Sequence, residues 1–180
     1  MPANDLRELL VEQLQDIYDA EQRITKALPK MAKAADSEEL ASAFEGHLRE
    51  TEEHVRRLEQ VFETLDESAK RKECKAMVGL LDEGKDMMEE NNPPNVRDAA
   101  LIAAAQKVEH YEMATYGCLR TWAELLGEDE AVQLLQQTLD EEGNADKKLT
   151  QVAQTLNVEA VEEEEEPARV RPPSRGNRAS

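Results

Sequence analysis

Apolar residues recur at steps of three and four along most of the chain, which is the spacing of one face of an α-helix. The first series runs from Leu6 to Leu28, and either Asn4 or Asp5 can cap its start. We therefore expect a first helix over residues 4–34. A break of a few polar and small residues then separates it from the next apolar series.

Three more long helices are predicted by the same pattern. The second follows Ser37, a good N-terminal capping residue, and should cover residues 38–65. The third should run from residue 96 or 97 to 126, where Gly127 can end it as a C-terminal cap, and the fourth over residues 129–157. Because the links from helix 1 to 2 and from helix 3 to 4 are short, each pair should be an antiparallel hairpin.

The connection between the two hairpins is long. Residues 66–96 are enough to run the ~45 Å length of a 30-residue helix, and CKAMVGLLDEGKDMMEE within them has the pattern of a short amphipathic helix. A single long crossover is typical of ferritin-like topology rather than of the simple up-down-up-down bundle. The predicted fold is therefore all-α: a ferritin-like four-helix bundle with a long crossover between helices 2 and 3 that carries a short extra helix.

The end of the chain differs from the rest. We expect the bundle to occupy residues 1–158 and residues 159–180 to form a disordered tail, because apolar periodicity is lost there. Five consecutive glutamates at 162–166 precede an Arg- and Pro-rich segment in this tail.

Composition and charge narrow the class of protein further. Only 3% of residues are aromatic, and 40 acidic against 22 basic residues give a formal net charge of -18. A β-sandwich and a binding surface for nucleic acid or an anionic membrane are therefore not expected. Without an apolar run of roughly 20 residues or a signal peptide, the protein should be cytoplasmic. Cys74 and Cys118 lie in no CxxC pattern and should be reduced thiols.

Several polar side chains fall inside the apolar stripes when each helix is drawn at about 100° per residue. Glu21 and Glu142 lie at the stripe centres of helices 1 and 4, with Asp146 one turn beyond Glu142. Helix 2 has His47 and His54 inside its stripe and Glu50 at the margin. Helix 3 has Glu112 inside its stripe and Glu109 towards the edge.

Four of these carboxylates should also lie at one height. Glu21 is 15 residues before Asp36 and Glu50 is 14 residues after it, so the two are level across the first hairpin. Glu112 and Glu142 are each 15 residues from Gly127 in the second hairpin. Since 15 residues span ~22 Å, all four should reach the middle of the bundle.

Buried carboxylates are costly unless protons or cations neutralise them. Oxygen ligands combined with imidazole suit Fe(II), Fe(III) or Mn(II), and bundles of this kind hold two metal ions between glutamates and histidines of facing helices. We therefore expect two iron ions, or alternatively two manganese ions. The alternative is a bundle whose inward acids are neutral or accept hydrogen bonds from Thr51, Tyr18 and Tyr116.

The chain resembles the ferritin-like superfamily at these residues, and more closely the YciE/YciF-type bacterial stress proteins. The resemblance covers residues 5–157 and rests on LVEQLQDIYDAEQRITKALPKMAKAA, HLRETEEHVRRLEQVF, CKAMVGLL, DAALIAAAQKVEHYEMATYG and LDEEGNADKKL. It implies a four-helix bundle with a dinuclear iron-type centre in a family whose activity is poorly defined.

The resemblance also implies roles for individual residues. Helix 1 would supply one ligand, helix 3 two ligands, and helices 2 and 4 the bridging carboxylates: Glu21, Glu109, Glu112, Glu50 and Glu142, respectively. Ferritins and rubrerythrins commonly have ExxH on helix 2, but residue 53 is Glu here. Either His54, which we prefer, or His47 would complete the site, and Asp146 would be a ligand or a hydrogen-bond partner.

Two functions follow from this prediction. The first is an oxidoreductase of peroxidase, ferroxidase or catalase type, acting on O2, H2O2 or Fe(II), with an unidentified external electron donor because the chain lacks the second metal domain of rubrerythrins. The second is a non-catalytic metal-binding or structural stress-response bundle. We expect a homo-oligomer, with a dimer favoured over a hollow shell.

Overall fold

The computed structural model describes residues 3–162, and these form helices without any strand. The helices are α1 (Leu6–Ala34), α2 (Glu38–Thr64), α3 (Lys75–Glu89), α4 (Pro94–Leu126) and α5 (Asp129–Glu162). The all-α prediction is confirmed. None of the helices within residues 3–162 combines the length and apolar character needed to cross a membrane.

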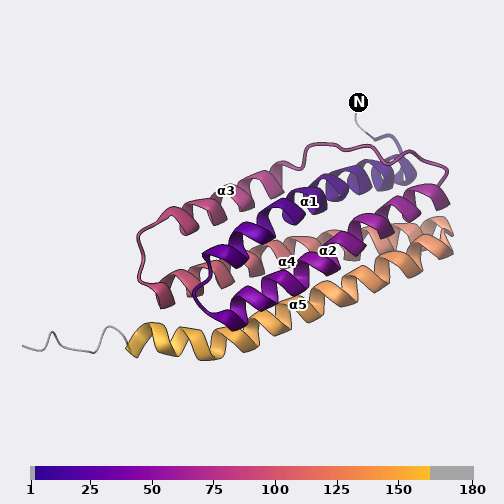
Figure 1. Ribbon diagram of the computed structural model, residues 1–180. Coiled ribbons are helices and arrows are strands. Elements are labelled where there is room, and N and C mark those ends of the chain that lie inside the picture. Colours follow the sequence, from indigo (N-terminus) through magenta and orange to yellow (C-terminus); the bar gives the residue numbers. More distant parts are fainter. Residues whose placement is uncertain (1–2, 163–180) are drawn as a thin grey trace, which may run out of the picture.

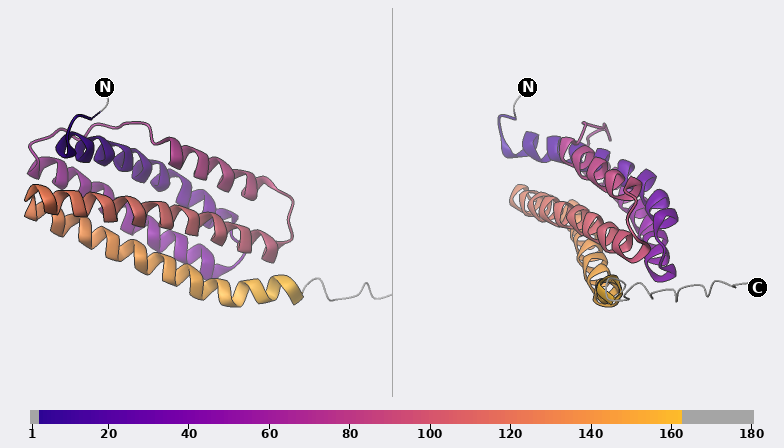
Figure 2. Two further views of the ribbon diagram at one scale, coloured as in Figure 1. Left: turned by 180° about the vertical axis from the view of Figure 1, so that it is seen from behind. Right: turned by 90° about the vertical axis from the view of Figure 1, so that its left-hand side faces the viewer.

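The four long helices form one bundle, and α3 lies on its outside (Figure 1). α1 packs against α2, and α4 packs against α5, as the short links require, while α2–α5 and α1–α4 contacts join the two hairpins. α3 belongs to the crossover and contacts α1 and α4 (Figure 2). The predicted ferritin-like topology, with its long crossover and short extra helix, is confirmed. Its consequence is that the apolar stripes of four helices face a common interior.

Local capping explains where the helices begin and end. The side chain of Asp5 accepts a hydrogen bond from the Glu8 amide at the start of α1, and Ser37 does the same for Leu40 at the start of α2. Gly127 ends α4 with a φ of 77°, a left-handed conformation that glycine adopts without steric cost. These three caps fix the lengths of the hairpins and hence the height of every inward side chain.

Two boundaries differ from the sequence prediction. α4 begins at Pro94, two to three residues earlier than expected, because proline favours the first turn of a helix, where its missing amide hydrogen has no partner to lose. α5 continues to Glu162, beyond the expected end at residue 157. The predicted disordered tail therefore starts inside a helix in the structure, and its remaining residues, 163–180, lie outside the described residues.

The interior is apolar along most of the bundle. Every long helix contributes fully buried side chains, among them Leu14, Phe44, Leu101, Tyr116 and Leu135. The same interior also contains buried glutamate and histidine side chains. Ionisable groups in an apolar interior are costly unless protons, counter-ions or hydrogen bonds offset their charge.

Asp98 at the start of α4 connects this helix to the link between α1 and α2. Its buried carboxylate accepts hydrogen bonds from the backbone amides of Asp36 (2.9 Å) and Ser37 (2.8 Å), which form the link between α1 and α2. We expect Asp98→Ala to lower the free energy of unfolding by about 2 kcal/mol, because two amides lose a charged acceptor. Urea denaturation measures this, and Asp98→Asn, which keeps one acceptor oxygen, should lose less. An unchanged urea midpoint for Asp98→Ala would contradict the assignment.

Candidate metal centre

Six buried side chains from all four long helices meet in the interior. They form two groups whose ligand atoms all lie within 4.8 Å of one another inside each group. The first group contains His47, Glu109, Glu112 and Glu142, and the second contains Glu21, His54 and Glu142. Glu142 belongs to both groups and so lies between two candidate ion positions. The structure thus brings together side chains that are far apart in sequence.

The first group is built by α2, α4 and α5. His47 Nε2 lies 3.2 Å from Glu109 Oε1 and 3.9 Å from Glu142 Oε2. Glu109 and Glu112 are one turn apart on α4, so both can point to the same side of the helix. The distances show one imidazole nitrogen facing two carboxylate oxygens, which is a suitable arrangement for ligands of a single cation.

The second group adds α1. His54 Nδ1 lies 2.9 Å from Glu142 Oε1 and 3.7 Å from Glu21 Oε1. The rings of His47 and His54 are 6.4 Å apart between centroids, so the two histidines serve different groups rather than one. The sequence left open which histidine would complete the site, and in the structure each of them faces its own set of carboxylates.

Hydrogen bonding leaves much of this cluster without partners. Among the described residues, nine buried side-chain atoms of the six residues make no hydrogen bond, including both oxygens of Glu112 and of Glu142. Some of these atoms lie in ion-pair contact with one another, such as His47 Nε2 with Glu109 Oε1 at 3.2 Å and His54 Nδ1 with Glu142 Oε1 at 2.9 Å. Both oxygens of Glu112 have neither a hydrogen bond nor an ion pair in the part of the chain that the structure describes. Buried polar groups are nearly always satisfied, so these atoms point to something else that binds them. A cation accepts such lone pairs, so the unsatisfied atoms suit metal ions.

The chemistry of the donor set gives the same result. Four carboxylates and two imidazoles make up the six residues, which is the ligand set of known dinuclear carboxylate sites in helical bundles. The distribution differs from the usual one, since both histidines come from α2 and the two paired glutamates come from α4. With neutral imidazoles, four carboxylates carry four negative charges, which two divalent cations would balance.

Protons provide the compensating charge when no cation is bound. Burial raises the pKa of Glu21 to about 8, helped by the nearby charge of Glu142, and raises that of Glu109 to about 7. Burial also holds the pKa of Glu112 well above its ordinary range. Burial opposes protonation of His54, but Glu142 and Glu21 outweigh it and raise the pKa to about 8. A cation entering the cluster must therefore displace protons.

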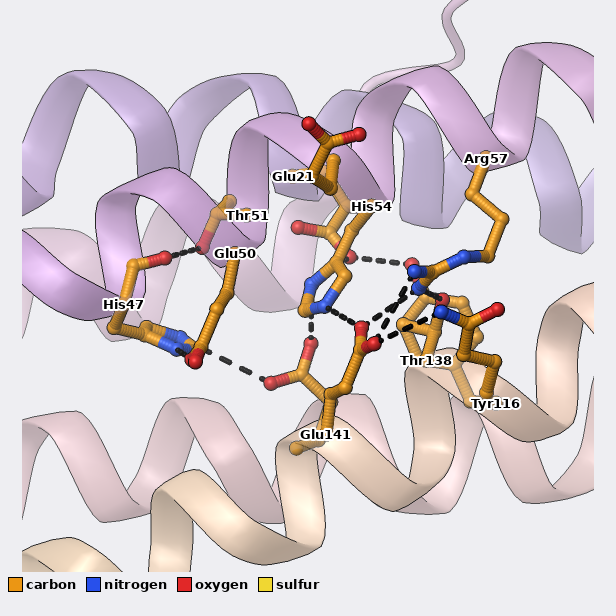
Figure 3. A network of polar contacts seen from close by, with 12 residues as sticks. Glu21, His47, Glu50, Thr51, His54, Arg57, Tyr116, Thr138 and Glu141 are labelled. Atoms are coloured by element: carbon orange, nitrogen blue, oxygen red, sulfur yellow. Dashed lines mark hydrogen bonds and ion pairs between the residues drawn. The ribbon is translucent and has the colours of Figure 1, made fainter.

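Glu141, which belongs to neither group, orients the ring of His54 (Figure 3). Glu141 Oε2 lies 2.9 Å from His54 Nε2, and Arg57 binds both oxygens of Glu141 at 2.8 and 3.2 Å. Partial burial works to raise the pKa of Glu141, but the bonds from Arg57 and Gln137 lower it, so the carboxylate is an acceptor only. His54 Nε2 must then carry the hydrogen, which leaves Nδ1 available to a metal.

The hydroxyl of Tyr116 is the one predicted alternative partner that reaches the cluster, where it donates to Glu21 Oε1. Thr51 bonds instead to the backbone carbonyl of His47, and Tyr18 to Glu59. The hydrogen-bonded alternative predicted from sequence therefore accounts for one contact of one carboxylate. It does not satisfy the remaining oxygens.

Two residues expected from the sequence do not join either group. Glu50 lies at the margin of the α2 stripe, where its side chain reaches solvent and contacts His47 Nδ1 at 3.5 Å, and this contact lowers its pKa. Asp146 accepts a hydrogen bond from Gln106 and lies 3.3 Å from the exposed His110. Neither residue belongs to the two groups in the structure. The bridging role of Glu50 and the ligand role of Asp146 therefore stay predictions.

Comparison with known proteins identifies the family. The chain belongs to the family of the domain of unknown function DUF892, whose model matches residues 5–162. It is 46% identical over 154 residues to Protein YciF of Escherichia coli K12, a match that covers 85% of this chain and 93% of that protein. The predicted resemblance to YciE/YciF-type stress proteins is confirmed.

Solved structures give the same result. The crystal structure of the Escherichia coli stress protein YciF matches with a TM-score of 0.85 at 44% identity, over 87% of this chain and 99% of that chain. YcfI of Rhodopseudomonas palustris, described as a candidate structural protein, matches with a TM-score of 0.80 at 44% identity, over 82% and 94% of the two chains.

Proposed function

We propose that this protein binds two transition-metal ions, iron or alternatively manganese, in the buried cluster, and that it uses them in a bacterial stress response. The observation that carries the proposal is the set of nine buried atoms without hydrogen-bond partners, distributed over two groups that share Glu142. The proposed ligands are four glutamates and two histidines: Glu21, His47, His54, Glu109, Glu112 and Glu142. Cytoplasmic action and a homo-oligomer, with a dimer favoured, are part of the same proposal.

The chemistry we propose is redox reaction with O2 or H2O2, or oxidation of Fe(II) as substrate. Two iron or manganese ions would supply one electron each and a Lewis-acidic position for the oxidant. The protein's own side chains have three tasks. The buried carboxylates balance charge, Glu141 and Arg57 fix the ring of His54, and the apolar core excludes bulk water. The hydroxyl of Tyr116 holds one oxygen of Glu21 in place.

The test is metal uptake followed by turnover. Anaerobic titration of metal-free protein should show two Fe(II) bound per chain, and the loaded protein should then consume peroxide or O2 faster than the same concentration of free iron. Glu21→Ala should bind less metal and lose consumption, whereas Asp140→Asn, an exposed change on α5, should do neither. Wild-type protein that binds no metal would refute the proposal.

A non-catalytic role is the second candidate, and the same unpartnered atoms favour it. A metal that satisfies them stabilises the folded state whether or not any reaction follows, because the unfolded chain lacks the site. The description of YcfI as a candidate structural protein agrees with this role. Loaded protein that melts at a higher temperature than metal-free protein, yet consumes oxidant no faster than free iron, would favour this candidate over the first.

A further inference from the structure

A small cavity of about 30 Å³ opens beside the first group of the cluster. Its walls are small or apolar side chains of all four long helices, namely Leu28, Ala43, Phe44, Ala105, Ala145 and Leu149. Its polar lining consists of His47, Glu50, Glu109 and Lys148. A volume of this size holds about one water molecule, so it is suited to a single small ion or molecule rather than to an organic substrate.

The polar side chains at the cavity form a series that leads inward from solvent. The exposed fraction of the side chain falls from 55% at Glu50 to 10% at His47 and then to 3% at Glu109. Glu142 follows with 0%. His47 joins the members of this series, since its Nδ1 lies 3.5 Å from Glu50 and its Nε2 lies 3.2 Å from Glu109. Each neighbouring pair could share a cation, so the series is continuous from the surface to the shared carboxylate.

The opposite side of the cluster has a different electrostatic character. There His54 is backed by Glu141, whose two oxygens are both occupied by Arg57. Figure 3 shows Glu50 beside His47 at one end of the polar network and Arg57 at the other. A guanidinium repels an approaching cation and leaves Glu141 without a free oxygen to bind one. Of these two sides, the one with Glu50 offers an exposed carboxylate to an arriving cation, whereas Arg57 holds both oxygens of Glu141 on the other.

We propose that this cavity is the entrance through which divalent cations reach the metal centre, and that Glu50 is the residue that captures them. This inference rests on the proposed metal binding and adds the route. Both ring nitrogens of His47 and one oxygen of Glu109 are buried at the cavity without hydrogen-bond partners. The nitrogens face the carboxylates of Glu50 and Glu109, so they can bind an ion once it has displaced the proton of His47. The ion exchanges water for the carboxylate of Glu50 and then for His47 and Glu109.

Lys148 opposes this capture. It lines the same cavity, and its Nζ would lie 3.7 Å from a side-chain carbon added at Gly46, which places the ammonium group over the α2 backbone near the opening. Its positive charge lies near that of the arriving cation and lowers the local concentration of such ions. The entrance therefore combines one residue that attracts cations with one that repels them.

Stopped-flow mixing of metal-free protein with Co(II), followed by the visible absorption of the bound ion, measures the rate of entry. We expect Glu50→Gln to slow the second-order uptake rate about tenfold and Lys148→Gln to speed it several-fold, both effects shrinking at high salt. The matched control is Glu52→Gln, which changes the same charge on the same helix at an exposed position outside the cavity lining and should alter the rate less than twofold.

The number of ions bound at equilibrium separates the possible outcomes. Glu50→Gln should still bind two ions per chain, and a fall to one would overturn the inference by showing that Glu50 is a permanent ligand. A second variant, Ala145→Leu, should slow uptake by filling the cavity without any change of charge. Normal uptake rates in both variants would refute the entrance while leaving two-ion binding intact. Absence of binding in the wild type would instead refute the proposed function.

Discussion

Replacing Glu112 by leucine should make the metal-free protein more stable, not less. Both oxygens of this buried carboxylate lack hydrogen-bond partners, and the charged groups that shift its pKa upward are acidic neighbours, with burial the larger cause. Leucine has similar volume and removes the desolvation cost of the carboxyl group. We expect the free energy of unfolding without metal to rise by about 1 to 3 kcal/mol, measured by urea denaturation in the presence of a chelator.

The same substitution should weaken metal binding. Glu112 belongs to the first group only, so the variant should bind about one ion per chain instead of two and gain less stability from metal than the wild type. Glu124→Leu, the identical change at an exposed position of α4, should alter neither property beyond about 0.5 kcal/mol. Lower stability of metal-free Glu112→Leu would mean that the carboxyl group stabilises the core, and the metal-centre interpretation would lose its main support.

The fold could be predicted from sequence because it depends on information that is local along the chain. The apolar period of 3.6 identifies the helices, Ser37 and Gly127 identify ends, and the length of the 66–96 segment identifies the crossover. The start of α4 and the end of α5 differ from the prediction because the local sequence signals there are weaker. Pro94 is compatible with both a loop and a first helical turn, and nothing in the α5 pattern requires the helix to stop at residue 157.

The candidate site could be predicted in part. Helical phase puts Glu21, Glu112 and Glu142 on the inward faces, and the short hairpin links put them at one height, so their proximity follows from sequence geometry. Their role as metal ligands stays a prediction. Helical phase also places Glu50 at the stripe margin, where its side chain is 55% exposed, and the bridging role predicted for it rests on the resemblance alone. If Glu50 were buried as a fifth carboxylate, the centre would need a further positive charge to balance it. At the margin of the stripe, the Glu50 side chain remains hydrated and needs none.

What the sequence could not provide is the contact between side chains of different hairpins. Glu141 is adjacent to Glu142 and off the centre of its stripe, so by pattern alone it is an ordinary surface acid. Its contacts with His54 and Arg57 depend on how far α5 is shifted along its axis relative to α2. Two helices can pack equally well with shifts that differ by a fraction of a turn, so the sequence does not determine this shift. Whether one or both of His47 and His54 face the carboxylates depends on the same register and on side-chain rotamers.

The metal-free protein should also lose stability as the pH rises from about 6 to 8. Glu21, Glu109 and His54 have folded-state pKa values of about 8, 7 and 8, above the ordinary 4.5 and 6.5 of such groups. Between the ordinary and the raised value, the folded chain retains a proton that the unfolded chain has released. Stability then falls with pH by about 1.4 kcal/mol per unit for each such proton. The total loss should reach at least about 3 kcal/mol over this range.

Bound cations should remove this dependence, because they replace the protons that the cluster otherwise holds. Carboxylates whose pKa is lowered, such as Asp19 beside Arg23 and Arg71, titrate below this range and do not disturb the measurement. Urea denaturation at several pH values, with chelator or with excess Mn(II), gives both curves, and Glu21→Gln should flatten the metal-free one. If stability without metal instead stayed constant or increased with pH, the buried acids would already be ionised, and a cluster that tolerates those charges alone would have no need of metal.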